Sequence, residues 1–71
     1  MSTVGVIGTG AIGVSWAAHF LNHGLSVVAS DPAPGAEGRL REGVAEIGAD
    51  PARLTFTADA GEAASAADFV Q

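Results

Sequence analysis

The chain has 71 residues, enough for one small domain, and 48% of them are hydrophobic, which excludes a disordered chain. Eight carboxylates against three arginines give a formal net charge of −5, so a nucleic-acid-binding surface is excluded. The sequence has no cysteine, no apolar run of the ~18 residues that span a membrane, and no basic signal-peptide start, so we expect a cytoplasmic protein without a membrane partner.

The first predicted elements are a strand over residues 3–7, rich in Val and Ile, and a helix over residues 11–24. On this helix the polar residues fall on one stripe, which we expect to be exposed, and small and apolar residues lie opposite, on the face that meets the sheet. The polar stripe is Ser15, His19, Asn22 and His23, and the opposite face is Gly13, Ala17, Phe20, Leu21 and Gly24. Gly24 is expected to be a left-handed cap.

Residues 25–31 predict a second strand that ends at Asp31, and a proline-rich loop leads into a second helix over residues 36–48. Gly38 and Gly43 each cost this helix about 1 kcal/mol relative to alanine, so we expect it to be the weakest element. Its predicted buried residues are Ala36, Leu40, Val44 and Ile47.

The last third of the chain predicts a third strand over residues 54–57, an alanine-rich helix over residues 60–67 and the start of a fourth strand at residues 68–71. Asp59 and Glu62 are spaced as in a capping box at the start of that helix. Strands that alternate with helices through short connections predict a parallel sheet with right-handed crossovers. In half of a doubly wound α/β domain, such a sheet has the spatial order 3-2-1-4.

Residues 8–13 form a G-x-G-x-x-G motif, Gly8-Thr9-Gly10-Ala11-Ile12-Gly13. The motif follows a predicted strand and opens a predicted helix, which is the context of a dinucleotide-binding loop. Gly8 permits the turn out of the strand, Gly10 leaves room for a pyrophosphate, and Gly13 lets the helix approach the sheet. The pyrophosphate would lie on the helix N-terminus, which attracts anions. All six residues are candidate cofactor-binding residues, and residues 1–71 are interpreted as the first half of a doubly wound α/β, or Rossmann, domain.

Asp31 is the predicted ribose-binding carboxylate, because it ends the second strand 18 positions after Gly13. A carboxylate there accepts hydrogen bonds from the ribose 2′- and 3′-hydroxyls and repels a 2′-phosphate. Since residues 31–38 contain no Arg or Lys, NAD is favoured over NADP. FAD-binding domains share the glycine motif, usually with Glu at this position, so FAD is an alternative. A simpler alternative is that the glycines form only a turn and a helix cap.

The first helix carries two further candidate features. His19 and His23 have a spacing that can chelate a metal, but no third ligand is evident, so solvated surface histidines are favoured. Trp16 lies between the core and polar stripes and is expected to pack at the sheet edge, or to cover a surface that further sequence or a partner subunit occupies. No carboxylate pair has the context of a general acid and base, so no catalytic residue and no metal ligand is predicted.

The stretches VGVIGTGAIGVSWAAHFLNHGLSVVASDPAPGAEGRLR, LTFTAD and ADFVQ resemble the start of the NAD-binding domain of the 3-hydroxyacyl-CoA dehydrogenase superfamily. SWAAHF and DPAPGAE are most similar to its carnitine dehydrogenase branch, with gulonate 3-dehydrogenase nearby. The chain is shorter than that family between REGVAEIG and RLTFT, which implies an abridged second helix. The resemblance implies the NAD-binding portion of an oxidoreductase that oxidises a 3-hydroxy group of a small molecule to a 3-keto group.

The resemblance also implies that the catalytic His, the Glu that supports it and the helical substrate-binding domain lie beyond Gln71. Residues 1–71 alone are therefore not expected to be catalytic, and they are interpreted as the cofactor-binding portion of a longer chain. A noncatalytic nucleotide-binding or assembly module is the alternative, and it would form a homodimer through the exposed edge of its fourth strand.

Overall fold

A computed structural model describes residues 2–70. In these residues the order of strands and helices is the predicted one, with a short 3-10 helix added before the third strand. The strands are β1 (Thr3–Ile7), β2 (Ser26–Ser30), β3 (Leu54–Thr57) and β4 (Phe69–Val70). The helices are α1 (Ala11–Asn22), α2 (Ala36–Ile47), the 3-10 helix η1 (Pro51–Arg53) and α3 (Ala60–Ala66).

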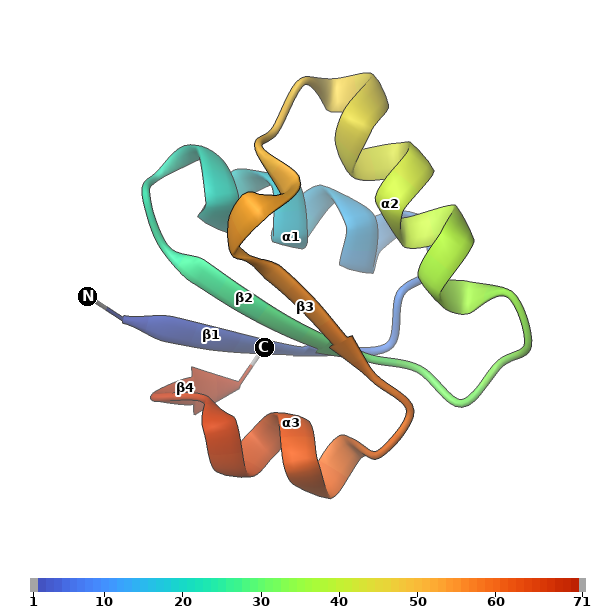
Figure 1. Ribbon diagram of the computed structural model, residues 1–71, viewed down its shortest axis with the longest axis vertical. Coiled ribbons are helices and arrows are strands. Elements are labelled where there is room, and N and C mark those ends of the chain that lie inside the picture. The colour runs from blue at the N-terminus through green and yellow to red at the C-terminus, as the bar shows by residue number, and fades with distance from the viewer. Residues whose placement is uncertain (1, 71) are drawn as a thin grey trace.

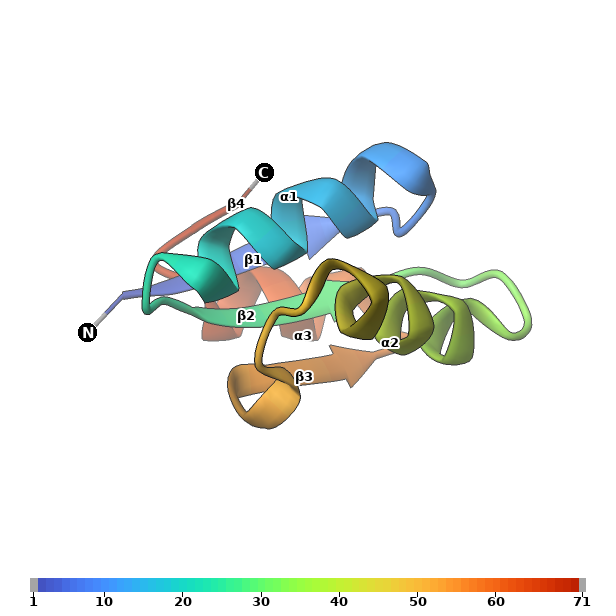
Figure 2. The same ribbon diagram turned by 90° about the horizontal axis from the view of Figure 1, so that it is seen from above.

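The strands form one parallel sheet in the order β3-β2-β1-β4, which confirms the predicted topology. β1 pairs with β2 along its whole length, so that Ile7 and Ser30 lie opposite each other where the two strands end. Helices α1 and α2 cover one face of the sheet and α3 covers the other (Figures 1 and 2). The fold is therefore the first half of a doubly wound sheet. In such sheets ligands bind beyond the carboxyl ends of the strands.

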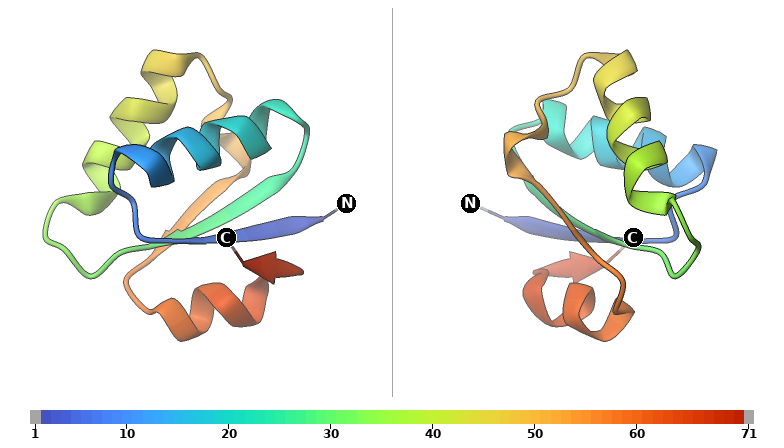
Figure 3. Two further views of the ribbon diagram at one scale, coloured as in Figure 1. Left: turned by 180° about the vertical axis from the view of Figure 1, so that it is seen from behind. Right: turned by 45° about the vertical axis from the view of Figure 1, so that its right-hand side comes forward.

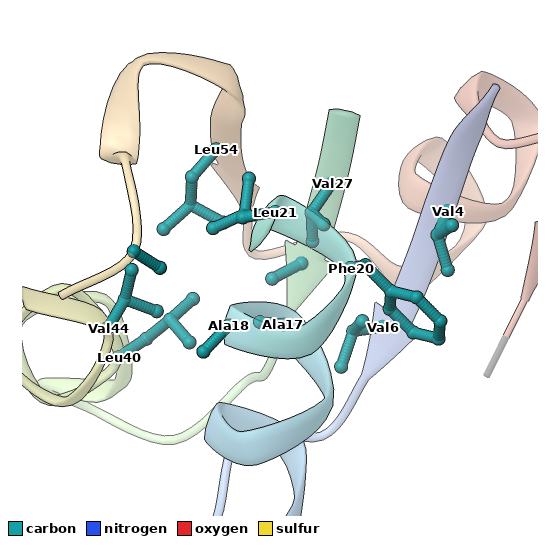
Figure 4. Packing of buried hydrophobic residues seen from close by; sticks show 12 residues of the cluster. Val4, Val6, Ala17, Ala18, Phe20, Leu21, Val27, Leu40, Val44 and Leu54 are labelled. Carbon is teal, nitrogen blue, oxygen red and sulfur yellow. The ribbon is translucent and has the colours of Figure 1, made fainter. Parts of the chain in front are cut away.

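The core lies between the sheet and the layer formed by α1 and α2 (Figure 4). Phe20 of α1 lies beside Val4 and Val6 of β1, and Leu21 points toward Leu54. The predicted polar stripe of α1 is exposed along its whole length. Gly24 has a φ of +80° and ends α1 as predicted. The buried cluster is Val4, Val6, Ala17, Ala18, Phe20, Leu21, Val27, Ala29, Leu40, Val44, Ala49 and Leu54.

One predicted core residue of α2 is wrong, because Ile47 is 51% exposed. The cause is Gly48, whose φ of +85° reverses the chain at the end of the helix. This turn returns Ala49 to the core, where its N–H donates to the Val44 carbonyl at 3.1 Å. The Gly48 N–H donates to the Ala45 carbonyl at 3.0 Å, which completes a Schellman motif. Ala49 thus takes the buried place that periodicity assigned to Ile47.

The predicted capping box of α3 is only half formed. The Asp59 carboxylate accepts hydrogen bonds from the N–H groups of Gly61 at 2.8 Å and Glu62 at 3.3 Å, as a capping residue should. The reciprocal contact differs, because the Asp59 N–H donates to the Thr57 hydroxyl at 3.2 Å. The Thr57 hydroxyl in turn donates a hydrogen bond to the Glu62 carboxylate at 3.5 Å. Thr57, which ends β3, therefore takes the part assigned to Glu62.

Candidate functional site

The fold requires two of the three motif glycines, Gly8 and Gly13, at the carboxyl end of β1. Gly8 has a φ of +89°, which favours glycine, and its N–H donates to the Ser30 carbonyl at 2.7 Å. A Cβ on Gly13 would collide with the Gly8 carbonyl oxygen and lie 3.0 Å from the carbonyl carbon. The close approach predicted for Gly13 is therefore made to the loop itself at the end of β1.

Gly10 differs from the other two glycines, because nothing in the fold requires it. Its φ of −66° and ψ of −172° suit any residue, and a Cβ there would have no protein atom within 4 Å. Space is therefore left open directly above the loop backbone. This is the arrangement that a close-packed ligand such as a pyrophosphate needs.

The first turn of α1 supplies the hydrogen-bond donors for an anion. The N–H groups of Gly8 and Thr9 are already committed, to the Ser30 carbonyl and to the Asp31 carboxylate. No side chain caps the start of α1, and no acidic residue lies in its first turn. The N–H groups of residues 10–13 therefore lie at the positive end of the helix dipole, and no capping side chain accepts a hydrogen bond from them. These donors fit a pyrophosphate.

A hollow of about 520 Å³ adjoins this loop. Ile12 is 76% exposed beside it, and Trp16 is 38% exposed while stacking on Phe20 with ring centroids 5.4 Å apart. Asp31 does not line this hollow. The lining residues are Val6, Ile7, Gly8, Gly10, Ile12, Gly13 and Trp16.

Asp31 lies immediately beyond β2 and is tied to the glycine loop. Its Oδ2 accepts hydrogen bonds from the Thr9 N–H at 2.8 Å and the Thr9 hydroxyl at 3.1 Å, and its Oδ1 accepts one from the Ala33 N–H at 2.9 Å. Figure 3 shows the loops that follow β1 and β2 at the same end of the sheet. The predicted acid and the predicted glycine loop are therefore brought together.

The surroundings of Asp31 favour its charged form. The N–H groups of Thr9 and Ala33 lower the pKa of this carboxyl below the usual value of an aspartate, against an opposing effect of partial burial. The Thr9 hydroxyl and the positive charge of Arg39 lower the pKa further, by smaller amounts. Asp31 is therefore ionised at neutral pH.

Sequence reasoning missed the position of Arg39. This residue lies in the first part of α2, but its Nη1 donates to the Pro34 carbonyl at 3.2 Å, so the guanidinium folds back over the loop after β2. Gly35 leaves room for it, because a Cβ there would lie 3.0 Å from Nη1. The sequence does contain a signal for this contact, because Arg39 is a long cationic side chain early in the helix that follows Asp31. Arg39 is the residue that directly follows the stretch 31–38, which has no Arg or Lys.

His19 of α1 and His23, which directly follows the helix, are exposed, and their ring centroids are 4.3 Å apart. The His23 ring uses Nδ1 in a 2.8 Å hydrogen bond with the His19 carbonyl. Among residues 2–70, no His, Asp or Glu side chains gather in a group of three or more that could hold a metal ion. In the same residues, no helix has the length and apolar character needed to cross a membrane.

The parallel sheet, the glycine loop and the acid at the end of β2 define a half Rossmann domain of the kind found in dinucleotide-binding proteins. A family model described as the NAD-binding domain of 3-hydroxyacyl-CoA dehydrogenase matches residues 3–71. The chain belongs to this family, which confirms the resemblance seen in the sequence.

The similar proteins include several bacterial L-carnitine dehydrogenases. The protein of Streptomyces griseus is 48% identical over 80 residues, which cover 96% of this chain and 24% of the relative. The protein of Pseudomonas aeruginosa is 44% identical over 82 residues, which cover all of this chain and 26% of the relative. The chain spans about a quarter of the length of these relatives. No solved structure shows a significant similarity to it.

The match with the Pseudomonas aeruginosa protein extends over 82 residues, whereas the chain has 71. The relative therefore has additional residues inside the matched region. This agrees with the expectation that the chain is shorter in this region than other members of its family. That the missing residues fall between α2 and β3 stays a prediction.

Proposed function

We propose that residues 1–71 are a partial NAD-binding domain that holds the ADP part of the cofactor. The N–H groups at the start of α1 bind the pyrophosphate, and Asp31 binds the adenosine ribose. The observation that carries this proposal is the 2.8 Å hydrogen bond from the Thr9 N–H to Asp31, because it brings the acid and the glycine loop to one place. The open space at Gly10 supports the same reading.

NAD is the favoured cofactor because an ionised carboxylate repels the 2′-phosphate of NADP. Arg39 could favour NADP instead, since a guanidinium is a good phosphate ligand. Its Nη1 is already hydrogen-bonded to the Pro34 carbonyl, and its charge acts on Asp31. We therefore propose that Arg39 stabilises the charged form of Asp31. The match to an NAD-binding family model favours NAD over FAD as well.

The whole protein, on this proposal, is a dehydrogenase that oxidises a 3-hydroxy group of a small molecule to a 3-keto group. The nicotinamide ring, when bound, accepts the hydride. L-Carnitine, which the names of the similar proteins give, is a substrate of this class. No residue of this chain is assigned as the proton acceptor, so residues 1–71 contribute cofactor binding. The homodimer and the cytoplasmic location stay predictions.

Calorimetric titration of the isolated chain with NADH, NADPH and FAD tests the proposal. NADH should bind most tightly, and Asp31→Asn should weaken NADH binding by about tenfold, because it removes a charge-assisted hydrogen bond. Glu46→Gln is the matched control, since it removes one carboxylate from the exposed face of α2. Failure of NADH to bind to the folded chain, or equal binding by the Asp31 variant, would contradict the proposal.

A further inference from the structure

We infer that the Thr9 hydroxyl is a positioning residue for the cofactor, because it fixes the Asp31 carboxylate and leaves one acceptor position on Oδ1 for a ribose hydroxyl. This inference rests on the proposed function and adds a residue that determines cofactor preference. The two residues are 22 positions apart in the sequence and meet only because β1 and β2 end side by side.

Thr9 directs both of its hydrogen-bond donors to the same oxygen. Its N–H and its hydroxyl lie 2.8 and 3.1 Å from Oδ2 of Asp31, and the residue is only 6% exposed. The backbone contact would be available to almost any residue at this position. The hydroxyl contact requires serine or threonine. The choice of threonine inside the glycine motif therefore has a purpose beyond the turn.

The remaining oxygen of Asp31 is only partly committed. An ionised carboxylate offers about four acceptor positions. Two on Oδ2 are filled by Thr9, and one on Oδ1 is filled by the Ala33 N–H at 2.9 Å. Three donors on two oxygens also prevent the carboxyl group from rotating. The open position on Oδ1 is therefore fixed in direction before any ligand arrives, which lowers the entropic cost of binding.

Fixing the carboxylate also affects the choice between NADH and NADPH. Without the hydroxyl, Asp31 would keep the N–H groups of residues 9 and 33 but lose one of the two donors that hold Oδ2, so its carboxylate could tilt away from a 2′-phosphate. A carboxylate held by Thr9 stays in place, so the repulsion persists. The hydroxyl should therefore strengthen NADH binding and preserve the preference over NADPH.

The test compares Thr9→Val, which has a similar shape without the hydroxyl, with Thr9→Ser, which retains it. In calorimetric titrations of the isolated chain, Thr9→Val should weaken NADH binding by about tenfold and leave NADPH binding within about twofold. Thr9→Ser should bind NADH within about twofold of the wild type. Titration of the Asp31 carboxyl carbon by NMR should give a raised pKa in Thr9→Val and an unchanged one in Thr9→Ser.

Two results would overturn the inference. One is a Thr9→Val chain with wild-type NADH affinity and an unchanged NADH to NADPH ratio, and the other is a Thr9→Ser chain that behaves like Thr9→Val. If Thr9→Val does not fold, Thr9→Ala takes its place, judged by the circular dichroism of the chain. If the wild type binds no NADH, the proposed function fails and the ribose role fails with it. The carboxyl titration then decides separately whether the hydroxyl holds Asp31.

Discussion

Replacing Gly10 and Gly13 by alanine, one at a time, should separate cofactor binding from folding. A Cβ on Gly13 would overlap the Gly8 carbonyl oxygen, and because the backbone fixes the positions of both atoms, no side-chain rotation can relieve the clash. The start of α1 must therefore move away from the end of β1. A Cβ on Gly10 would project into open space.

The magnitudes follow from these two environments. Overpacking costs about 1–3 kcal/mol, and we take the upper part of that range for a backbone clash at Gly13. Alanine inside α1 returns about 1 kcal/mol of helix propensity, so Gly13→Ala should lower the free energy of unfolding by about 2 kcal/mol. Gly10→Ala should lower it by about 0.5 kcal/mol, because alanine is a poorer N-cap than glycine.

Urea unfolding followed by circular dichroism measures both free energies, and calorimetry measures NADH binding. Gly10→Ala should fold almost normally and lose at least tenfold in NADH affinity, since its methyl group occupies the space assigned to the pyrophosphate. A Gly10→Ala chain that binds NADH like the wild type would refute our interpretation of the open space. A Gly13→Ala chain of unchanged stability would refute the close approach of α1 to the loop.

Three further changes test other parts of the structure. Gly38→Ala should raise the free energy of unfolding by about 1 kcal/mol in urea titrations, whereas Gly43→Ala should not, because a Cβ there would crowd a valine of α1 at 2.6 Å. Asp59→Ala should lower it by about 1 kcal/mol through loss of the α3 cap. Asp31→Asn should make stability fall less steeply on acidification. Because the pKa of Asp31 is lowered by folding, the ionised carboxylate stabilises the fold above the ordinary aspartate pKa of about 3.9, and this stabilisation is lost as the pH falls through the pKa of the folded state.

Each of these predictions has a clear opposite result. Equal stabilisation by Gly38→Ala and Gly43→Ala would contradict the close packing of α2 on α1. For the α3 cap, Ser65→Ala is the matched control on the exposed face of the same helix, and an equal effect of both changes would argue against capping. For Asp31, parallel stability curves of wild type and Asp31→Asn between pH 5 and the acid limit would contradict the lowered pKa.

The features that the sequence predicts correctly are those with a local cause. Gly24 and Gly48 both end helices, and Val and Ile mark β1 before the glycine motif. Strands that alternate with helices through short connections then leave few arrangements, since parallel crossovers are right-handed. The parallel sheet follows from this pattern, and its strand order follows from the doubly wound fold that the glycine motif indicates.

The features that the sequence does not predict depend on contacts between distant or flexible parts. Ile47 continues the helical periodicity, and only the left-handed turn at Gly48 shows that Ala49 is buried instead. The hydrogen bond between Thr9 and Asp31 depends on the register of β1 and β2. The contact of Arg39 with the Pro34 carbonyl depends on the rotamer of the arginine side chain, and a pattern of residue types does not predict rotamers.

The most direct test of the central claim is an amide NMR titration of the isolated chain with NADH, run in parallel with NADPH. We predict that the largest shifts lie at residues 10–13 and at Asp31, with NADH the tighter ligand. A well-dispersed spectrum of a folded chain that responds to neither cofactor would contradict it, and the glycine loop would then serve only the turn from β1 into α1.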